Sequence, residues 1–119
     1  MIVNVTGRHV EINDMLREHV EGRLQAEFAG FPRIESVHVI LMVEKHRHVA
    51  EIVAQVPHHG TVEAKHESND MYASIDAAIE KTAVQLRKWV EKRHEHKAEK
   101  LGRIDKAVHA KDGREPAAG

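Results

Sequence analysis

The longest regular spacing of apolar residues in the chain runs from residue 68 to about residue 96. Apolar side chains recur there every three or four positions, as one face of an α-helix requires. They are Met71, Ile75, Ala78, Ile79, Leu86, Trp89 and Val90. Ser68, Asn69 and Asp70 precede them and can cap the first turn. The pattern therefore predicts one long helix that packs on the rest of the domain along its first half.

A shorter amphipathic helix is predicted from about residue 14 to residue 28. Its apolar residues repeat every four positions, and they are Ile12, Leu16, Val20, Leu24 and Phe28. Asn13 and Asp14 make a favourable helix start. Gly30 and Pro32 end the helix, because proline lacks the N–H that would continue the hydrogen-bond ladder.

Four runs predict β-strands, at residues 2–6, 37–44, 49–56 and 61–67. The run 37–44 is almost continuously apolar, as in a strand inside a sheet, and the two that follow alternate between apolar and polar positions. Short polar turns at 45–47 and 57–60 make the last three strands antiparallel. The first strand is joined to the second by the short helix, so those two should be parallel.

The elements therefore follow the order β-α-β-β-β-α. Strands with one apolar face need a cover, and two helices with one apolar stripe each supply it. We predict an α+β fold with two layers, a four-stranded sheet with two helices on one face, formed by residues 1–97. Apolar periodicity fades afterwards, so residues 98–119 are expected to form a flexible C-terminal tail.

The formal net charge of −1 conceals two oppositely charged parts. Residues 1–80 contain seven basic and thirteen acidic residues, whereas residues 81–111 contain ten basic and four acidic ones. A positive stripe on a helix favours a polyanion, although an ordinary solvated face stays open as the alternative. With further basic residues near turns, the expected RNA-binding set is Lys81, Arg87, Lys88, Lys92, Arg23, Lys45 and Arg47.

Several kinds of site are disfavoured by what the sequence lacks. Cysteine is absent, which excludes disulfides and thiolate metal sites and suits a cytoplasmic protein. No apolar run approaches the roughly 18 residues of a membrane span. Neither phosphate-binding glycine motifs nor a nucleophile elbow occurs, so we expect no enzyme, no cofactor and no small-molecule substrate.

Eleven histidines invite a metal-binding hypothesis. Their spacing brings no three or four ligands together, as a site without cysteine would require, so no metal is expected. A histidine-rich module for protein interaction or metal response stays open as the second hypothesis. The glycine-aromatic signature of an RRM and the Gly-x-x-Gly loop of a KH domain are also missing, which favours folded RNA read through its phosphates.

Three segments carry a resemblance to a known family: Thr6–Ile12, Val43–Glu51 and Asp70–Asp76, the last followed by Lys81, Gln85 and Lys88. In this order they resemble the bacterial ribosome hibernation-promoting factors and ribosome-associated translation inhibitors over roughly residues 1–97. The resemblance implies a β-α-β-β-β-α domain on the small ribosomal subunit, at the region that binds messenger and transfer RNA. It also implies translation inhibition through ribosomal RNA contacts, under stress or in stationary phase.

Two departures from the family pattern matter. Val84 stands where members often carry arginine before the glutamine matched by Gln85. We also expect no second, C-terminal dimerisation domain of the kind that the long members carry, so the chain resembles the short members. These either help ribosomes to pair, in some cases with a second factor, or hold them as inactive single ribosomes. The mildly basic sequence before Asp112 favours the pairing type.

Overall fold

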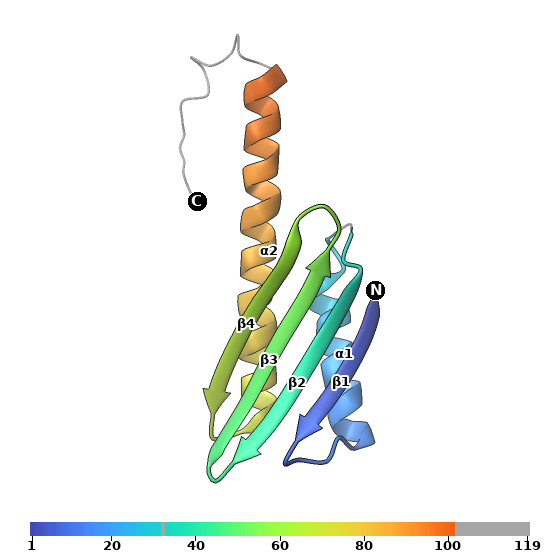
Figure 1. Cartoon of the computed structure of the whole chain (residues 1–119), viewed down its shortest axis with the longest axis vertical. Coiled ribbons are helices and arrows are strands. Elements are labelled where there is room, and N and C mark those ends of the chain that lie inside the picture. The colour runs from blue at the N-terminus through green and yellow to red at the C-terminus, as the bar shows by residue number, and fades with distance from the viewer. Residues whose placement is uncertain (32, 102–119) are drawn as a thin grey trace. The chain divides into compact units, whose positions relative to one another are not determined.

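The computed structural model describes the backbone of residues 1–31 and 33–101, and the side chains of residues 1–31 and 33–90. The elements are β1 (Ile2–Arg8), α1 (Asp14–Phe28), β2 (Ser36–Glu44), β3 (Arg47–Val56), β4 (Gly60–Ser68) and α2 (Met71–Leu101). This β-α-β-β-β-α order confirms the prediction (Figure 1). One compact unit comprises Met1–Val84, and a second begins at Gln85 within α2.

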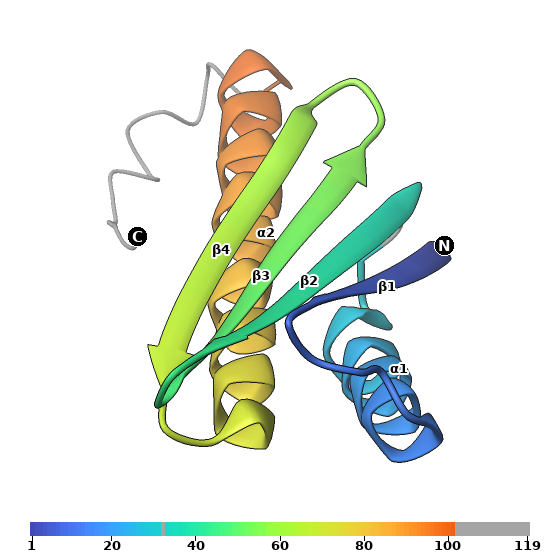
Figure 2. The same ribbon diagram turned by 60° about the horizontal axis from the view of Figure 1, so that its bottom comes forward.

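The first unit consists of a sheet with the strand order β1-β2-β3-β4 and two helices. β1 pairs with β2 in parallel, and the other two pairs are antiparallel, as predicted. Figures 1 and 2 show α1 and the first part of α2 on the same face of the sheet, α1 against β1 and β2 and α2 against β3 and β4. The predicted two-layer α+β fold with both helices on one face is therefore confirmed.

The core lies between the sheet and the helices, at the positions that the apolar periodicity indicates. In α1 the buried residues are Leu16, Val20, Leu24 and Phe28, four positions apart. In β3 the helix-facing residues Ala50, Ile52, Ala54 and Val56 are buried as well. Among the described side chains of α2 that belong to the first unit, the buried apolar residues are Met71, Ile75, Ala78, Ile79 and Ala83.

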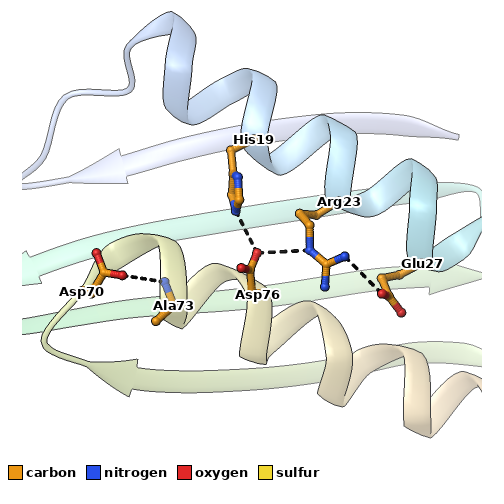
Figure 3. Close-up of polar contacts among 6 residues, drawn as sticks. All are labelled: His19, Arg23, Glu27, Asp70, Ala73 and Asp76. Carbon is orange, nitrogen blue, oxygen red and sulfur yellow. Dashed lines mark hydrogen bonds and ion pairs between the residues drawn. The ribbon is translucent and has the colours of Figure 1, made fainter.

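Both helices begin at a side-chain cap. The Asn13 Oδ1 atom accepts a hydrogen bond from the Leu16 N–H at 2.8 Å. The Asp70 Oδ2 atom accepts one from the Ala73 N–H at 3.2 Å, as Figure 3 shows. Each cap satisfies a backbone donor that has no partner within its helix. The predicted helix starts are thus confirmed.

Ser74 fixes the start of α2 against the sheet. Its side chain is completely buried, and its hydroxyl donates a hydrogen bond of 2.6 Å to the backbone oxygen of His48 in β3. The same hydroxyl lies 2.6 Å from the hydroxyl of Ser68 at the end of β4. Because a buried hydroxyl without partners would destabilise the fold, these contacts explain how α2 tolerates a serine on its buried side.

Some element boundaries differ from the prediction. β1 continues through Gly7 to Arg8, where the sequence indicated an end at Thr6, because Gly7 and Arg8 pair with Leu41 and Met42 of β2. At the other end of the chain, α2 extends to Leu101. Residues 102–119, most of the predicted tail, lie outside the described residues.

Gly7 should be intolerant of a side chain. A Cβ atom at this position would lie 2.3 Å from the backbone oxygen of Val10, so the backbone would have to shift. We expect Gly7→Ala to lower the free energy of unfolding by about 1–3 kcal/mol. Thermal unfolding followed by circular dichroism measures this effect.

Gly22 provides the matched control, because a Cβ atom there would meet nothing within 4 Å. Gly22 lies inside α1, where alanine is favoured over glycine by about 0.5–1 kcal/mol. Gly22→Ala should therefore raise the melting temperature. If both substitutions shifted it equally, the close approach at Gly7 would not be what constrains that position.

Candidate nucleic-acid interface

Lys81 is the one predicted RNA-binding residue of α2 that lies in the first unit. Its side chain is exposed, and its Nζ atom donates a hydrogen bond of 3.1 Å to the backbone oxygen of Lys65. Lys65 belongs to β4, an edge strand of the sheet. An ammonium group has three donors, so this contact positions the charge and leaves two donors for another acceptor.

Arg87 and Lys88 are exposed on the part of α2 that belongs to the second unit. Lys88 follows Lys81 by seven residues on one helix, which corresponds to about two turns and places both on the same stripe. The side chain of Lys92 lies outside the described residues. Val84, at the position where the family often carries arginine, is 40% exposed.

Arg23 takes part in an ion-pair network that joins α1 to α2 (Figure 3). Its Nε atom donates to Asp76 Oδ1 at 3.1 Å, and its Nη1 atom donates to Glu27 Oε2 at 3.2 Å. Asp76 Oδ1 also lies 2.7 Å from Nε2 of His19. Two carboxylates therefore face the single guanidinium and cancel much of its attraction for an anion.

Lys45 and Arg47 lie at the turn between β2 and β3. Lys45 is exposed and has a positive φ of 57°, a conformation that non-glycine residues seldom adopt. Arg47 contacts the carboxylates of Glu44 and Glu67 at 3.2 Å and 3.0 Å. Like Arg23, it is held by two acidic partners.

The Arg47–Glu67 contact shifts the pKa values of both groups. The hydrogen bond that Arg47 donates to Glu67 lowers the pKa of Glu67, and the same hydrogen bond, together with the negative charge of Glu67, raises the pKa of Arg47. The lowered pKa of Glu67 means that this pair stabilises the fold above the unfolded-state pKa of glutamate, and that the stabilisation is lost as pH falls. Both side chains are about half exposed, so the contribution is small.

The histidines of the described region are distributed over separate elements. His19 contacts Asp76, and Nε2 of His38 lies 2.8 Å from the Thr6 hydroxyl on the sheet face that the helices leave uncovered. Within residues 1–31 and 33–90, no three histidine or acidic side chains are placed to hold a metal ion. In the same part of the chain, no helix is long and apolar enough to cross a bilayer.

Sequence reasoning missed the partners of the basic residues. From the sequence, Asp76 was noted only as part of the segment Asp70–Asp76 that resembles the family, and His19 was not singled out. The four-residue spacing of His19, Arg23 and Glu27 indicates a shared helix face. It does not reveal Asp76, which lies 53 residues after Arg23 and becomes its neighbour only through the packing of α1 beside α2.

Comparison with known proteins gives consistent matches over most of the chain. The family described as sigma 54 modulation protein / S30EA ribosomal protein matches residues 3–94. The ribosome hibernation promoting factor of Escherichia coli K12 is 41% identical over 96 residues, which cover 81% of this chain and 100% of that protein.

Two solved structures are similar in fold and sequence. A ribosomal subunit interface protein from Coxiella burnetii has a TM-score of 0.72 at 30% identity, covering 76% of this chain and 99% of that one. The N-terminal domain of Thermus thermophilus Protein Y has a TM-score of 0.68 at 30% identity, covering 75% and 99%. The chain belongs to the sigma 54 modulation protein / S30EA ribosomal protein family, which confirms the predicted relationship to the ribosome hibernation-promoting factors.

Proposed function

We propose that this protein is a non-enzymatic translation regulator that binds the ribosome and promotes its hibernation. The observation that carries the proposal is the match to a ribosome hibernation promoting factor over the whole length of that protein. The similar fold of a ribosomal subunit interface protein from Coxiella burnetii supports the same role. The partner we propose is the small subunit, at the region that binds messenger and transfer RNA, with ribosomal RNA as the contacted surface.

The exposed basic residues of α2 are the groups best suited to meet phosphates. Lys81, Arg87 and Lys88 are exposed and have no ion pair with a carboxylate among the described side chains. Arg23 and Arg47 each face two carboxylates, so we expect them to contribute less attraction. Lys45 lies at the turn between β2 and β3, and Lys92 follows Lys88 on α2. We include both in the proposed RNA-binding surface.

Sedimentation of extracts from resting cells over a sucrose gradient tests the partner. We expect the protein to migrate with small subunits and with inactive ribosomes. The mildly basic sequence before Asp112 leads us to expect paired ribosomes, with a second factor as a further partner, under stress or in stationary phase. Absence of the protein from every ribosomal fraction would contradict the proposal.

Salt dependence tests the chemistry of the contact. Each phosphate that a basic residue neutralises releases counterions, so the logarithm of the binding constant should fall steeply with the logarithm of salt concentration. We expect Lys88→Gln to reduce this slope by about one. Titrations of labelled protein with purified ribosomes at several salt concentrations measure the slope.

Arg47→Gln is the matched control, because it removes one positive charge that already has two acidic partners. It should change the slope less than Lys88→Gln does. A flat salt dependence for the unmodified protein would contradict contacts with phosphates altogether.

A further inference from the structure

Tyr72 is the most exposed aromatic side chain in the described part of the chain, at 36%. It lies in the first turn of α2, whereas Phe28 is buried in the core at 3%. Among the described residues, the Tyr72 hydroxyl has no hydrogen-bond partner. A large apolar ring that stays at the surface, with an unused polar group, suits an external ligand better than a place in the core.

The Tyr72 ring is held in a defined orientation. Its centroid lies 4.8 Å from that of the His19 ring, and the two planes meet at 85° in an edge-to-face contact. His19 is itself fixed by the 2.7 Å contact between its Nε2 atom and Asp76 Oδ1. An aromatic surface that is oriented before binding loses less conformational entropy when a ligand arrives.

The same Asp76 oxygen also orients a guanidinium group. Asp76 accepts a hydrogen bond of 3.1 Å from Arg23 Nε, and Glu27 holds Arg23 Nη1 at 3.2 Å (Figure 3). A guanidinium has five N–H donors, so three remain for another acceptor. Arg23 is 29% exposed, which leaves these donors accessible from the surface between α1 and α2.

We propose that Tyr72 and Arg23 form a binding site for one unpaired nucleotide of a folded RNA. The base stacks on the Tyr72 ring, and a neighbouring phosphate accepts hydrogen bonds from Arg23. Asp76 and His19 are positioning residues that couple the two groups. This inference rests on the proposed function and adds to it a place where the protein contacts a base.

The Tyr72 ring and the Arg23 guanidinium together indicate which class of ligand the site binds. Every nucleobase has a flat face that stacks on an aromatic ring, and the guanidinium fork matches phosphate geometry. Met15, which is 69% exposed, lies one helical turn before His19 and extends the apolar part of this surface. Folded RNA offers such a nucleotide in loops and bulges, where bases are unstacked.

The site formed by Tyr72 and Arg23 should orient the bound RNA rather than attract it from a distance. Arg23 carries one positive charge, whereas Asp76 and Glu27 carry two negative charges, so the group does not by itself attract a polyanion. Stacking involves no counterion release. Substitution of Tyr72 should therefore weaken binding without changing its salt dependence, which distinguishes this site from the basic stripe of α2.

Titration of purified bacterial ribosomes with Tyr72 variants tests the proposal. Tyr72→Leu keeps an apolar side chain but removes the flat ring, and we expect affinity to fall by roughly 5- to 150-fold with an unchanged salt slope. Tyr72→Trp, the matched control, should bind about as tightly as the parent. Melting temperatures of both variants verify that each is folded.

Ultraviolet cross-linking at zero length supplies an independent readout. In the parent protein bound to ribosomes, mass spectrometry should find Tyr72 covalently attached to a nucleotide, and Asp76→Asn, which weakens the positioning contacts, should reduce the yield. If folded Tyr72→Leu binds as tightly as the parent, or if Tyr72 cross-links to a ribosomal protein, the nucleotide site is wrong. If the nucleotide site is wrong but the parent protein still binds ribosomes in a salt-dependent way, the proposed function stands. If the parent protein does not bind ribosomes at all, both the nucleotide site and the proposed function are wrong.

Discussion

Reversing the charges of Arg87 and Lys88 together should weaken ribosome binding by on the order of a hundredfold at low salt, about tenfold for each residue. Both side chains are exposed on α2. Each glutamate would place a repulsion where we propose an attraction to phosphate. The salt dependence of binding should become shallower by about two units. Binding titrations and inhibition of a cell-free translation reaction measure both effects.

Folding should be almost unaffected by this double reversal. Substitutions of exposed charged residues usually change stability by no more than about half a kcal/mol each, so Arg87→Glu/Lys88→Glu should melt near the parent temperature. A matched control reverses the exposed Arg8 and Lys65, which lie on β1 and β4, and changes the net charge by the same amount. If both double variants lose affinity equally, net charge governs binding and the α2 stripe has no special role.

The fold was predictable because its elements leave simple periodic signals. The period of four in Leu16, Val20, Leu24 and Phe28 predicts the buried face of α1, and all four are buried. The sequence was less informative at the edge of the sheet. Gly7 and Arg8 belong to β1 through backbone pairing with β2, and neither residue type signals a strand, so the predicted strand ended too early.

The candidate site was only partly predictable, because sequence shows where charges occur but not which charges face one another. Arg23 and Arg47 looked equivalent to Lys88 as cations. The structure places Arg23 against Asp76 and Glu27, and Arg47 against Glu44 and Glu67. Asp76 and Glu67 are distant in the sequence from the arginines they contact, and only the packing of the sheet and helices brings these pairs together. Whether Lys81, Arg87 and Lys88 meet RNA stays a prediction.

The polar residues of the helices fall into two groups that should have different effects on ribosome binding. Substitutions in the network around Asp76 should alter the geometry of binding, since the network orients a ring and a guanidinium. Substitutions of the exposed cations of α2 should alter the strength and salt dependence of binding. Apolar residues on the opposite side of α2 should affect binding only through folding, and Ile79 tests this.

Ile79→Ala should lower the free energy of unfolding by about 2–5 kcal/mol. Ile79 lies on α2 in the first unit and is completely buried, so truncation removes core contacts and leaves a cavity that the surrounding side chains fill only in part. For a domain of this size the melting temperature should fall by on the order of 10–30 °C. Thermal and denaturant unfolding followed by circular dichroism measure the loss.

Val84→Ala is the control, because Val84 lies on the same helix and is 40% exposed. It should change stability by no more than about half a kcal/mol. Ribosome affinity of Ile79→Ala should match the parent when it is measured well below the variant's melting temperature, since Ile79 contacts no ligand in the proposed surface. Equal destabilisation by both substitutions would show that α2 does not bury the face assigned to it. A loss of affinity in fully folded Ile79→Ala would show that packing and binding on this helix are not separable.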